Sequence, residues 1–256
     1  MGLEQLRSTW PLSRVRVQGG DVDVVRTGGT GAPVILLPGA QGTAETFYKQ
    51  LLGWGGRRPL VSVTYPPLTD GAALADFVAA LANALDAERF DLVGTSLGGY
   101  IAQWVAARHP ARVDRLVVGN SFCDPAPAQS ADKRRALDRD AGVIKAEALA
   151  RIEGAPDSEL KSVQLDLMGR CQPAATLRAR MLAVQLAVPV PPLGVPDERI
   201  LLLECDDDPL IPAPMRAALR HKHPGARHVA LPTGGHYPYI TQADAYGAAV
   251  GAFLGL

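Results

Sequence analysis

Five short, uninterrupted apolar runs recur along this chain and are bounded by turn residues. They are PVILLP at 33–38, PLVSVTY at 59–65, FDLVGTS at 90–96, RLVVGN at 115–120 and RILLLEC at 199–205. Runs this rich in Val, Ile and Leu are typical of strands covered on both faces. Segments with helical spacing separate the first four runs, at 44–53, 71–86 and 97–108. This alternation predicts an α/β fold with a mostly parallel, doubly wound sheet.

The alternation is preceded by a predicted hairpin (13–18 with 22–26) and stops after Asn120. Residues 121–196 contain no convincing strand, but three amphipathic stretches occur near 131–152, 157–169 and 174–187, and a proline-rich run follows at 188–196. We predict one core domain, 1–120 with 197–256, and a helical cap insertion at 121–196. Ligands of open α/β sheets bind at the carboxyl ends of the strands, so the cap is expected to cover a ligand crevice. The alternative is that the insertion only extends the fold.

Bulk composition limits the partners and the compartment. The 256 residues are 47% hydrophobic and 20% charged, which suits one α/β core. Twenty-six basic residues balance twenty-six acidic ones, so a nucleic-acid partner is not expected. Three scattered cysteines, no apolar leader at the start and no long apolar stretch predict a cytoplasmic protein without a membrane span.

A nucleophile motif ends the apolar run at 90–96. Gly94-Thr95-Ser96-Leu97-Gly98 has the form G-x-S-x-G and stands between FDLV and the helical YIAQWVAARHP. In this strand–turn–helix setting the motif resembles the nucleophile elbow of α/β-hydrolases. The two glycines let strand and helix approach without side-chain clashes, and the turn lifts the serine hydroxyl above the sheet. The motif therefore predicts Ser96 as a catalytic nucleophile.

His236 is the predicted general base, because a serine hydroxyl needs a base to take its proton. It lies in LPTGGHYPYI, a glycine-bearing loop that follows a short strand-like run near the end of the chain. The alternative is an ordinary surface-loop histidine. His109 ends the helix after the elbow and is interpreted as a partner of the helix dipole. Three further histidines are predicted to be exposed at a helix end and loop: His221, His223 and His228.

The acid that orients the histidine is expected in the segment 203–212, which closes the apolar run at 199–205 and precedes a predicted helix. Its carboxylates should emerge at the same end of the sheet as Ser96. Many hydrolases have an aspartate four residues before a proline at this place, and Asp208 precedes Pro212 with that spacing. The spacing favours Asp208 and leaves Asp207 as an alternative.

Two backbone N–H groups are expected to bind the oxyanion of a tetrahedral intermediate. Leu97, directly after the nucleophile, should donate one. The other is predicted from Ala40, in the loop PGAQG after the run at 33–38. Hydrolases usually have a histidine where this chain has Pro38, so the sequence does not assign the hydrogen bonds that support the loop.

The chain resembles the α/β-hydrolase superfamily over nearly its whole length, and several stretches resemble the maspardin group within it. They are LLPGAQGTAETFYKQLLGWG, VSVTYPPLTD, VGTSLGGYIAQWVA, GNSFCDP and HPGARHVALPTGGHYPYI. The resemblance implies the α/β-hydrolase fold. Maspardins are known more as binding or adaptor proteins than as enzymes, and the histidine of the triad is not constant among them. This chain has His236 at that place.

These residues favour a serine hydrolase of the carboxylic-ester type that cleaves an ester, thioester or lactone through an acyl-enzyme intermediate. The expected partner is a small-molecule acyl substrate, and the mechanism needs no metal or organic cofactor. The alternative is a non-catalytic, maspardin-like binding or adaptor protein, which would have a protein partner. A further hypothesis places Trp104, Phe122 and Met168 around a lipophilic acyl pocket.

Overall fold

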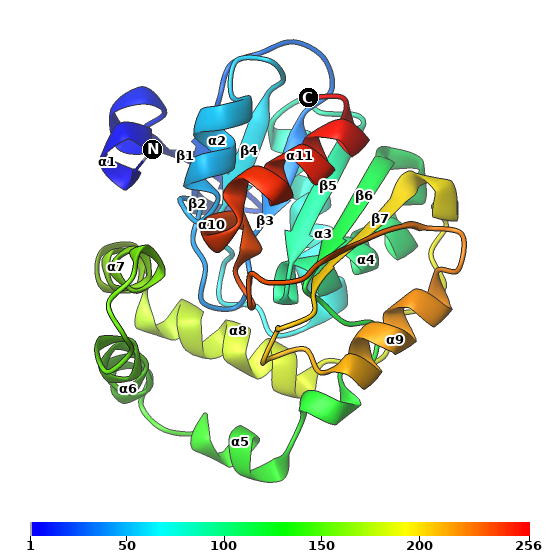
Figure 1. The fold of residues 1–256 in the computed structure, drawn as a ribbon. Helices are drawn as coiled ribbons and strands as arrows, with labels where there is room; N and C mark the ends of the chain where they lie inside the picture. Colours follow the sequence, from blue (N-terminus) through cyan, green and yellow to red (C-terminus); the bar gives the residue numbers. More distant parts are fainter. Residues whose placement is uncertain (1) are drawn as a thin grey trace.

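The computed structural model describes residues 2–256 and is built on an eight-stranded sheet with the order β1-β2-β4-β3-β5-β6-β7-β8 (Figure 1). The strands are β1 (Leu12–Val17), β2 (Gly20–Arg26), β3 (Val34–Leu37), β4 (Leu60–Val63), β5 (Phe90–Thr95), β6 (Val113–Gly119), β7 (Ile200–Cys205) and β8 (Arg227–Leu231). β1 and β2 form the predicted hairpin, and β2 also runs antiparallel to β4. The other neighbours are parallel. The predicted mostly parallel α/β sheet is confirmed.

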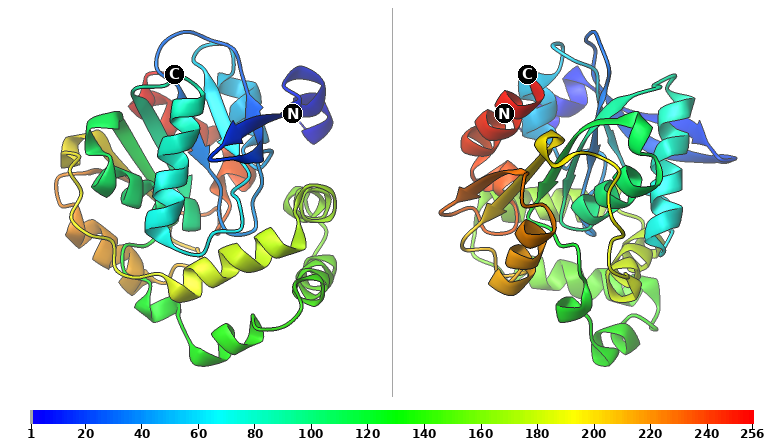
Figure 2. Two further views of the ribbon diagram at one scale, coloured as in Figure 1. Left: turned by 180° about the vertical axis from the view of Figure 1, so that it is seen from behind. Right: turned by 90° about the vertical axis from the view of Figure 1, so that its right-hand side faces the viewer.

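Helices cover both faces of the sheet (Figure 2). Within β3, Ile35 and Leu37 belong to the apolar cluster on one face, whereas Val34 and Leu36 belong to the cluster on the other. The first cluster includes side chains of α3 (Gly71–Ala84), α4 (Leu97–Arg108) and α9 (Ala213–Lys222). The second includes side chains of α1 (Leu3–Thr9), α2 (Tyr48–Trp54), α10 (Pro238–Thr241) and α11 (Ala243–Leu254).

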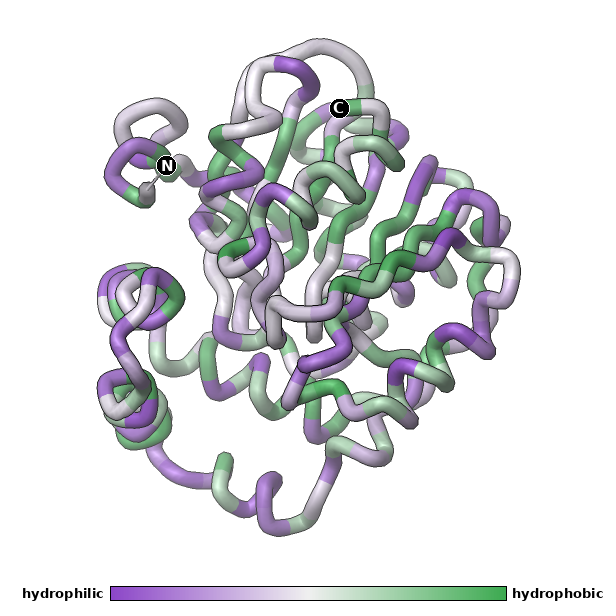
Figure 3. The backbone as a smooth tube through the Cα atoms, viewed as in Figure 1, coloured by the Kyte–Doolittle hydropathy of each residue, from purple (hydrophilic) through white to green (hydrophobic). Residues whose placement is uncertain are grey.

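The central strands are the most hydrophobic part of the backbone trace, and the outer helices between β6 and β7 alternate hydrophilic and hydrophobic residues (Figure 3). This pattern places the core between the two helical layers, as expected for buried parallel strands. Across residues 2–256, none of the helices has the length and apolarity needed to cross a membrane.

The segment between β6 and β7 is helical and lies beyond the carboxyl ends of the central strands (Figures 1 and 2). Its main helices are α5 (Ala131–Ala136), α6 (Ala141–Glu153), α7 (Glu159–Asp166) with a π-helical continuation (Leu167–Cys171), and α8 (Ala174–Leu186). The amphipathic stretch at 131–152 is split, because Asp140 caps a new helix by accepting from the Gly142 and Val143 N–H groups. The division into a core and a cap at 121–196 remains our proposal.

Ion pairs and a hydrogen bond join α7 to helices α1 and α2. Arg7 of α1 pairs with Glu45 at 2.8 Å and with Asp166 at 2.6 Å. The Tyr48 hydroxyl of α2 donates to Glu159 at 2.7 Å. Because these contacts hold α7 against α1 and α2, the space between the helical segment and the strand ends is bounded on that side.

Candidate active site

Ser96 occupies the turn between β5 and α4, with φ 53° and ψ −123°. This left-handed conformation is strained for a residue with a side chain, and the Ser96 N–H is fixed by donation to the Gly119 carbonyl at 3.0 Å. A Cβ atom on Gly94 would lie 2.2 Å from the Gly98 carbonyl oxygen, and one on Gly98 would lie 1.9 Å from the Leu37 carbonyl oxygen. Both glycines are therefore required for strand and helix to approach this closely.

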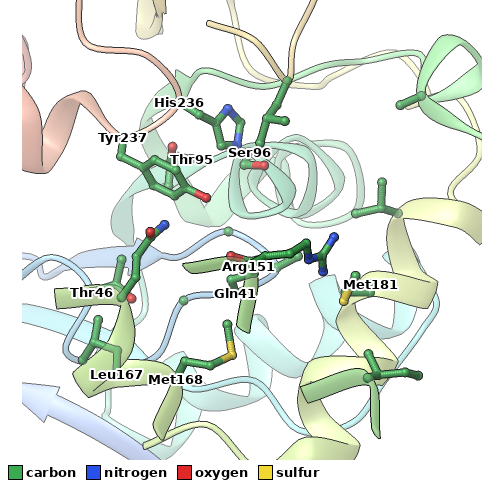
Figure 4. Close-up of a pocket in the computed structure, with 18 of the residues that line it drawn as sticks. Gln41, Thr46, Thr95, Ser96, Arg151, Leu167, Met168, Met181, His236 and Tyr237 are labelled. Carbon is green, nitrogen blue, oxygen red and sulfur yellow. The ribbon is translucent and has the colours of Figure 1, made fainter. Parts of the chain in front are cut away.

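His236 and Asp208 are joined at the carboxyl end of the sheet. The His236 Nδ1 lies 2.9 Å from Asp208 Oδ2 and 3.1 Å from Oδ1, and both residues are buried. With the proton on Nδ1, the imidazole donates to the carboxylate and its Nε2 is left unprotonated. Ser96 and His236 line the same pocket (Figure 4). The three residues predicted for a triad thus lie at the same end of the sheet.

Hydrogen bonds keep the Asp208 carboxylate ionised despite its burial. Burial raises the pKa of Asp208, but hydrogen bonds from His236, Asn120 and the Leu210 N–H outweigh it, so the pKa lies below its ordinary value. The Asn120 amide donates to Asp208 Oδ2 at 2.8 Å, and the Leu210 and Ile211 N–H groups donate to Oδ1 at 2.8 and 3.2 Å.

Asn120 is the site residue that sequence reasoning missed. Its buried amide donates to Asp208 and also to the Gly235 carbonyl at 2.9 Å. Asn120 is the last residue of the apolar run at 115–120 and directly follows β6. Parallel strands place site residues at this end, so its position was the signal in the sequence.

Asp207, the alternative candidate for the acid, forms no hydrogen bond with the His236 imidazole and instead binds the backbone of its loop. Its Oδ1 accepts from the Gly235 N–H at 2.8 Å and its Oδ2 from the Gly234 N–H at 3.2 Å. The carboxylate is exposed and fixes the loop that carries His236, whereas the imidazole itself bonds to Asp208.

The predicted oxyanion donors lie in the loop after β3 and at the start of α4. Ala40 lines the pocket with Ser96. Leu97 is the first residue of α4, so its N–H has no partner within the helix. The sequence did not assign the hydrogen bonds that support the Ala40 loop. One of them comes from Tyr65, whose buried hydroxyl donates to the Pro38 carbonyl at 3.1 Å.

The pocket has a volume of about 800 Å³ and lies between the sheet edge and helices α5 to α8. Phe122 and Met168 line it, as the acyl-pocket hypothesis expected, but Trp104 does not. Trp104 instead lies beside Tyr100 of the same helix, α4, with the two ring centres 6.3 Å apart. Within residues 2–256, no three His, Cys, Asp or Glu side chains are grouped to hold a metal ion.

The remaining histidines have structural contacts. His109 is the C-cap residue of α4, and its Nε2 lies 2.9 Å from Asp76 Oδ1. His221 and His228 are exposed, but the prediction of exposure was wrong for His223. That side chain is buried, and its Nδ1 lies 3.2 Å from Asp197.

Comparison with known proteins identifies the family. A model described as the alpha/beta hydrolase family matches residues 34–249. Maspardin from Danio rerio is 28% identical over 253 residues, which cover 93% of this chain and 80% of that protein, so the predicted resemblance is confirmed. A solved hydrolase from Pseudomonas aeruginosa PA01 is 22% identical, with a TM-score of 0.77 and coverage of 96% of this chain and 98% of that one. A thermophilic esterase from Thermogutta terrifontis is 21% identical, with a TM-score of 0.75 and coverage of 95% and 97%. This chain belongs to the alpha/beta hydrolase family.

Proposed function

We propose that this chain is a serine hydrolase that cleaves a carboxylic ester or a related acyl bond, such as a thioester or lactone. The main support for the proposal is that Asp208 is hydrogen-bonded to the His236 imidazole, and that His236 and Ser96 line the same pocket. An oriented imidazole beside a serine on a strained elbow is the arrangement that nucleophilic acyl transfer requires.

In the proposed reaction, Ser96 Oγ attacks the acyl carbon while His236 Nε2 takes its proton. Asp208 keeps the imidazole in the required tautomer and stabilises the imidazolium. The Ala40 and Leu97 N–H groups hold the oxyanion, aided by the positive end of the α4 dipole. His236 then returns the proton to the departing alcohol, and water hydrolyses the acyl-enzyme by the same steps, releasing the acid.

Hydrolysis of a panel of p-nitrophenyl esters tests the proposal. We expect Ser96→Ala and His236→Ala each to reduce turnover by at least ~10³-fold, with thermal unfolding used to verify that both variants fold. Ser121→Ala is the comparison variant: its hydroxyl donates to the Ser96 backbone carbonyl at 2.6 Å. Loss of this one hydrogen bond should reduce turnover by less than about 10-fold. Turnover that is unchanged in Ser96→Ala would contradict the proposal.

A second candidate is a non-catalytic binding protein, which the relationship to maspardin favours. A fluorophosphonate probe separates the two, because it labels only an activated serine. Labelling that is lost in Ser96→Ala and kept in Ser121→Ala supports the hydrolase. Absence of both labelling and ester turnover supports the binding protein, for which a protein partner is then sought.

We also propose a cytoplasmic location. The three cysteines, Cys123, Cys171 and Cys205, are free thiols in the structure, as is usual for proteins of a reducing compartment. Fractionation of the source cells tests this, and recovery in a membrane or secreted fraction would contradict it.

A further inference from the structure

The pocket that contains Ser96 has two chemically different sides. The sheet side carries Ser96, His236 and the Ala40 loop. On the opposite side, α5 and α6 with their connecting loop contribute charged side chains. Apart from His236, the charged lining residues of the described chain are Lys133, Arg139, Glu147 and Arg151.

Only one of these cations lacks a partner in residues 2–256. Arg139 forms a two-pronged ion pair with Glu147, with distances of 2.6 and 2.8 Å, so their charges cancel. The Lys133 ammonium donates to the Ala128 carbonyl at 3.0 Å. Arg151 has neither a hydrogen bond nor an ion pair with the described residues, and its side chain points into the pocket (Figure 4). Lys133 and Arg151 therefore both lack a carboxylate partner among the described residues, and the lining carries two positive charges beyond the Arg139–Glu147 pair. Of these two cations, only Arg151 has all of its N–H groups available for a ligand.

Most of the remaining pocket lining is apolar. Met168, Met181 and Val184 belong to it, together with Leu137 and Ile144. Such a lining accepts a hydrocarbon chain, because burial of apolar surface is favourable. A guanidinium prefers a planar anion, above all a carboxylate that it can bind through two N–H groups.

From this arrangement we infer the substrate class: an acyl substrate that carries a carboxylate, separated from the scissile carbonyl by an apolar spacer, with the carboxylate paired to Arg151. This inference rests on the proposed hydrolase function. Because the protein has no net charge, the local charge of Arg151 rather than overall attraction would select the anion.

The test compares substrates that differ only in charge. Half-esters of adipate and suberate with p-nitrophenol carry the carboxylate on the acyl side, and the corresponding carboxamides are neutral and of the same shape. Butyrate esters of 6-hydroxyhexanoate and of its carboxamide place the charge on the alcohol side and are followed by acid release in a pH-stat. We expect kcat/KM to favour the carboxylate over its carboxamide by about 10-fold in at least one series, since Arg151 is exposed and partly screened by solvent.

Arg151→Gln should remove this preference, because it should lower kcat/KM for the carboxylate substrates about 10-fold more than for the carboxamides. Arg135→Gln is the matched control: it removes an equal charge from α5, but Arg135 is exposed, pairs with Asp132 and does not line the pocket. The control should keep the preference.

The outcomes separate the two proposals. Carboxamide substrates cleaved through Ser96 with no preference for either carboxylate series would overturn the inference and leave the hydrolase function standing. A preference that survives in Arg151→Gln, or that Arg135→Gln removes equally, would also overturn it. No cleavage of any charged or neutral substrate would overturn the hydrolase function, and the inference with it.

Discussion

Asn120 donates a hydrogen bond of 2.8 Å to the carboxylate of Asp208, and both side chains are buried. The same amide group donates to the carbonyl of Gly235, the residue that precedes His236, at 2.9 Å. One amide thus fixes both the carboxylate and the backbone of the loop that carries the imidazole. The alignment of His236 with Asp208 therefore depends on a third side chain, which does not line the pocket.

The first prediction concerns that amide. Asn120→Ala should lower kcat for a p-nitrophenyl ester by about 10- to 100-fold, because a hydrogen bond to a charged group contributes ~1.5–3 kcal/mol. KM should change little, because Asn120 does not line the pocket. Steady-state kinetics measure both constants, and thermal unfolding checks that the variant is folded. A rise in KM with unchanged kcat would contradict the assigned role.

The second prediction separates the two neighbouring aspartates. Asp208→Asn should reduce kcat by roughly 10⁴-fold, because the amide cannot hold the imidazole in the required tautomer. Asp207→Asn retains an acceptor oxygen for the loop and should cost less than about 10-fold. Steady-state kinetics measure kcat for both variants, and thermal unfolding checks that each variant is folded. A larger loss in Asp207→Asn than in Asp208→Asn would reverse the assignment.

Local patterns in the sequence predicted much of the fold and the central part of the site. Apolar runs bounded by turn residues are short-range signals, so the strands, the hairpin and the elbow around Ser96 could be located from them. The maspardin resemblance added the fold that those elements form.

Contacts between distant residues could not be predicted in the same way. Asn120 and Asp208 are 88 positions apart, and nothing in the local sequence specifies that the two side chains meet. His223 lies in a basic, polar stretch that is typical of a surface, yet it is buried against Asp197, 26 positions away. The break in the stretch at 131–152 was missed for a local reason, because the apolar spacing continues across the cap residue Asp140.

The third prediction tests the steric basis of the elbow. Gly98→Ala would place a Cβ atom 1.9 Å from the Leu37 carbonyl oxygen, and because this neighbour is backbone, the clash cannot be relieved by a rotamer change. We expect the variant to be insoluble or to lose at least ~4 kcal/mol of unfolding free energy. Chemical denaturation measures the loss.

Gly247→Ala provides the control for this substitution. Gly247 lies within α11, and its added Cβ would meet no atom within 4 Å. Alanine has the higher helix propensity, so this variant should be more stable by up to ~1 kcal/mol. Equal stability of Gly98→Ala and the wild-type protein would refute the steric argument.

The fourth prediction concerns pH and His223. Burial lowers the pKa of His223, and the Asp197 carboxylate offsets only part of the effect. The unfolded chain therefore binds a proton near the ordinary value of 6.5, whereas the folded protein does so only at lower pH. The contribution of His223 to the free energy of unfolding is therefore complete above pH 6.5, the ordinary pKa. It is lost as the pH falls from there through the lower pKa of the folded protein.

Thermal unfolding of the wild type and His223→Gln between pH 8 and pH 5 measures this contribution. The melting temperature of the wild type should fall more steeply with decreasing pH than that of the variant, whatever their difference at pH 8. Parallel curves would show that His223 has the same pKa in the folded and unfolded states.

The fifth prediction concerns Arg180 of α8, whose side chain is fully buried. In residues 2–256 none of its three guanidinium nitrogens has a hydrogen-bond partner, and burial lowers its pKa to about 10. Its guanidinium carbon lies 5.8 Å from the centre of the Tyr65 ring. Such a cation–π contact contributes up to ~2 kcal/mol, whereas removal of a cation from water costs several kcal/mol. The charge is therefore a net cost to the folded state.

Arg180→Met keeps a long, unbranched side chain in the same space and removes that cost. We expect at least ~1 kcal/mol of stabilisation, which corresponds to a rise of about 2–4 °C in melting temperature for a protein of this size. Arg180→Lys is the control, because it retains a buried cation and should gain nothing. Calorimetry measures all three proteins, and a lower melting temperature in Arg180→Met would show that interior contacts of the guanidinium outweigh its lost hydration.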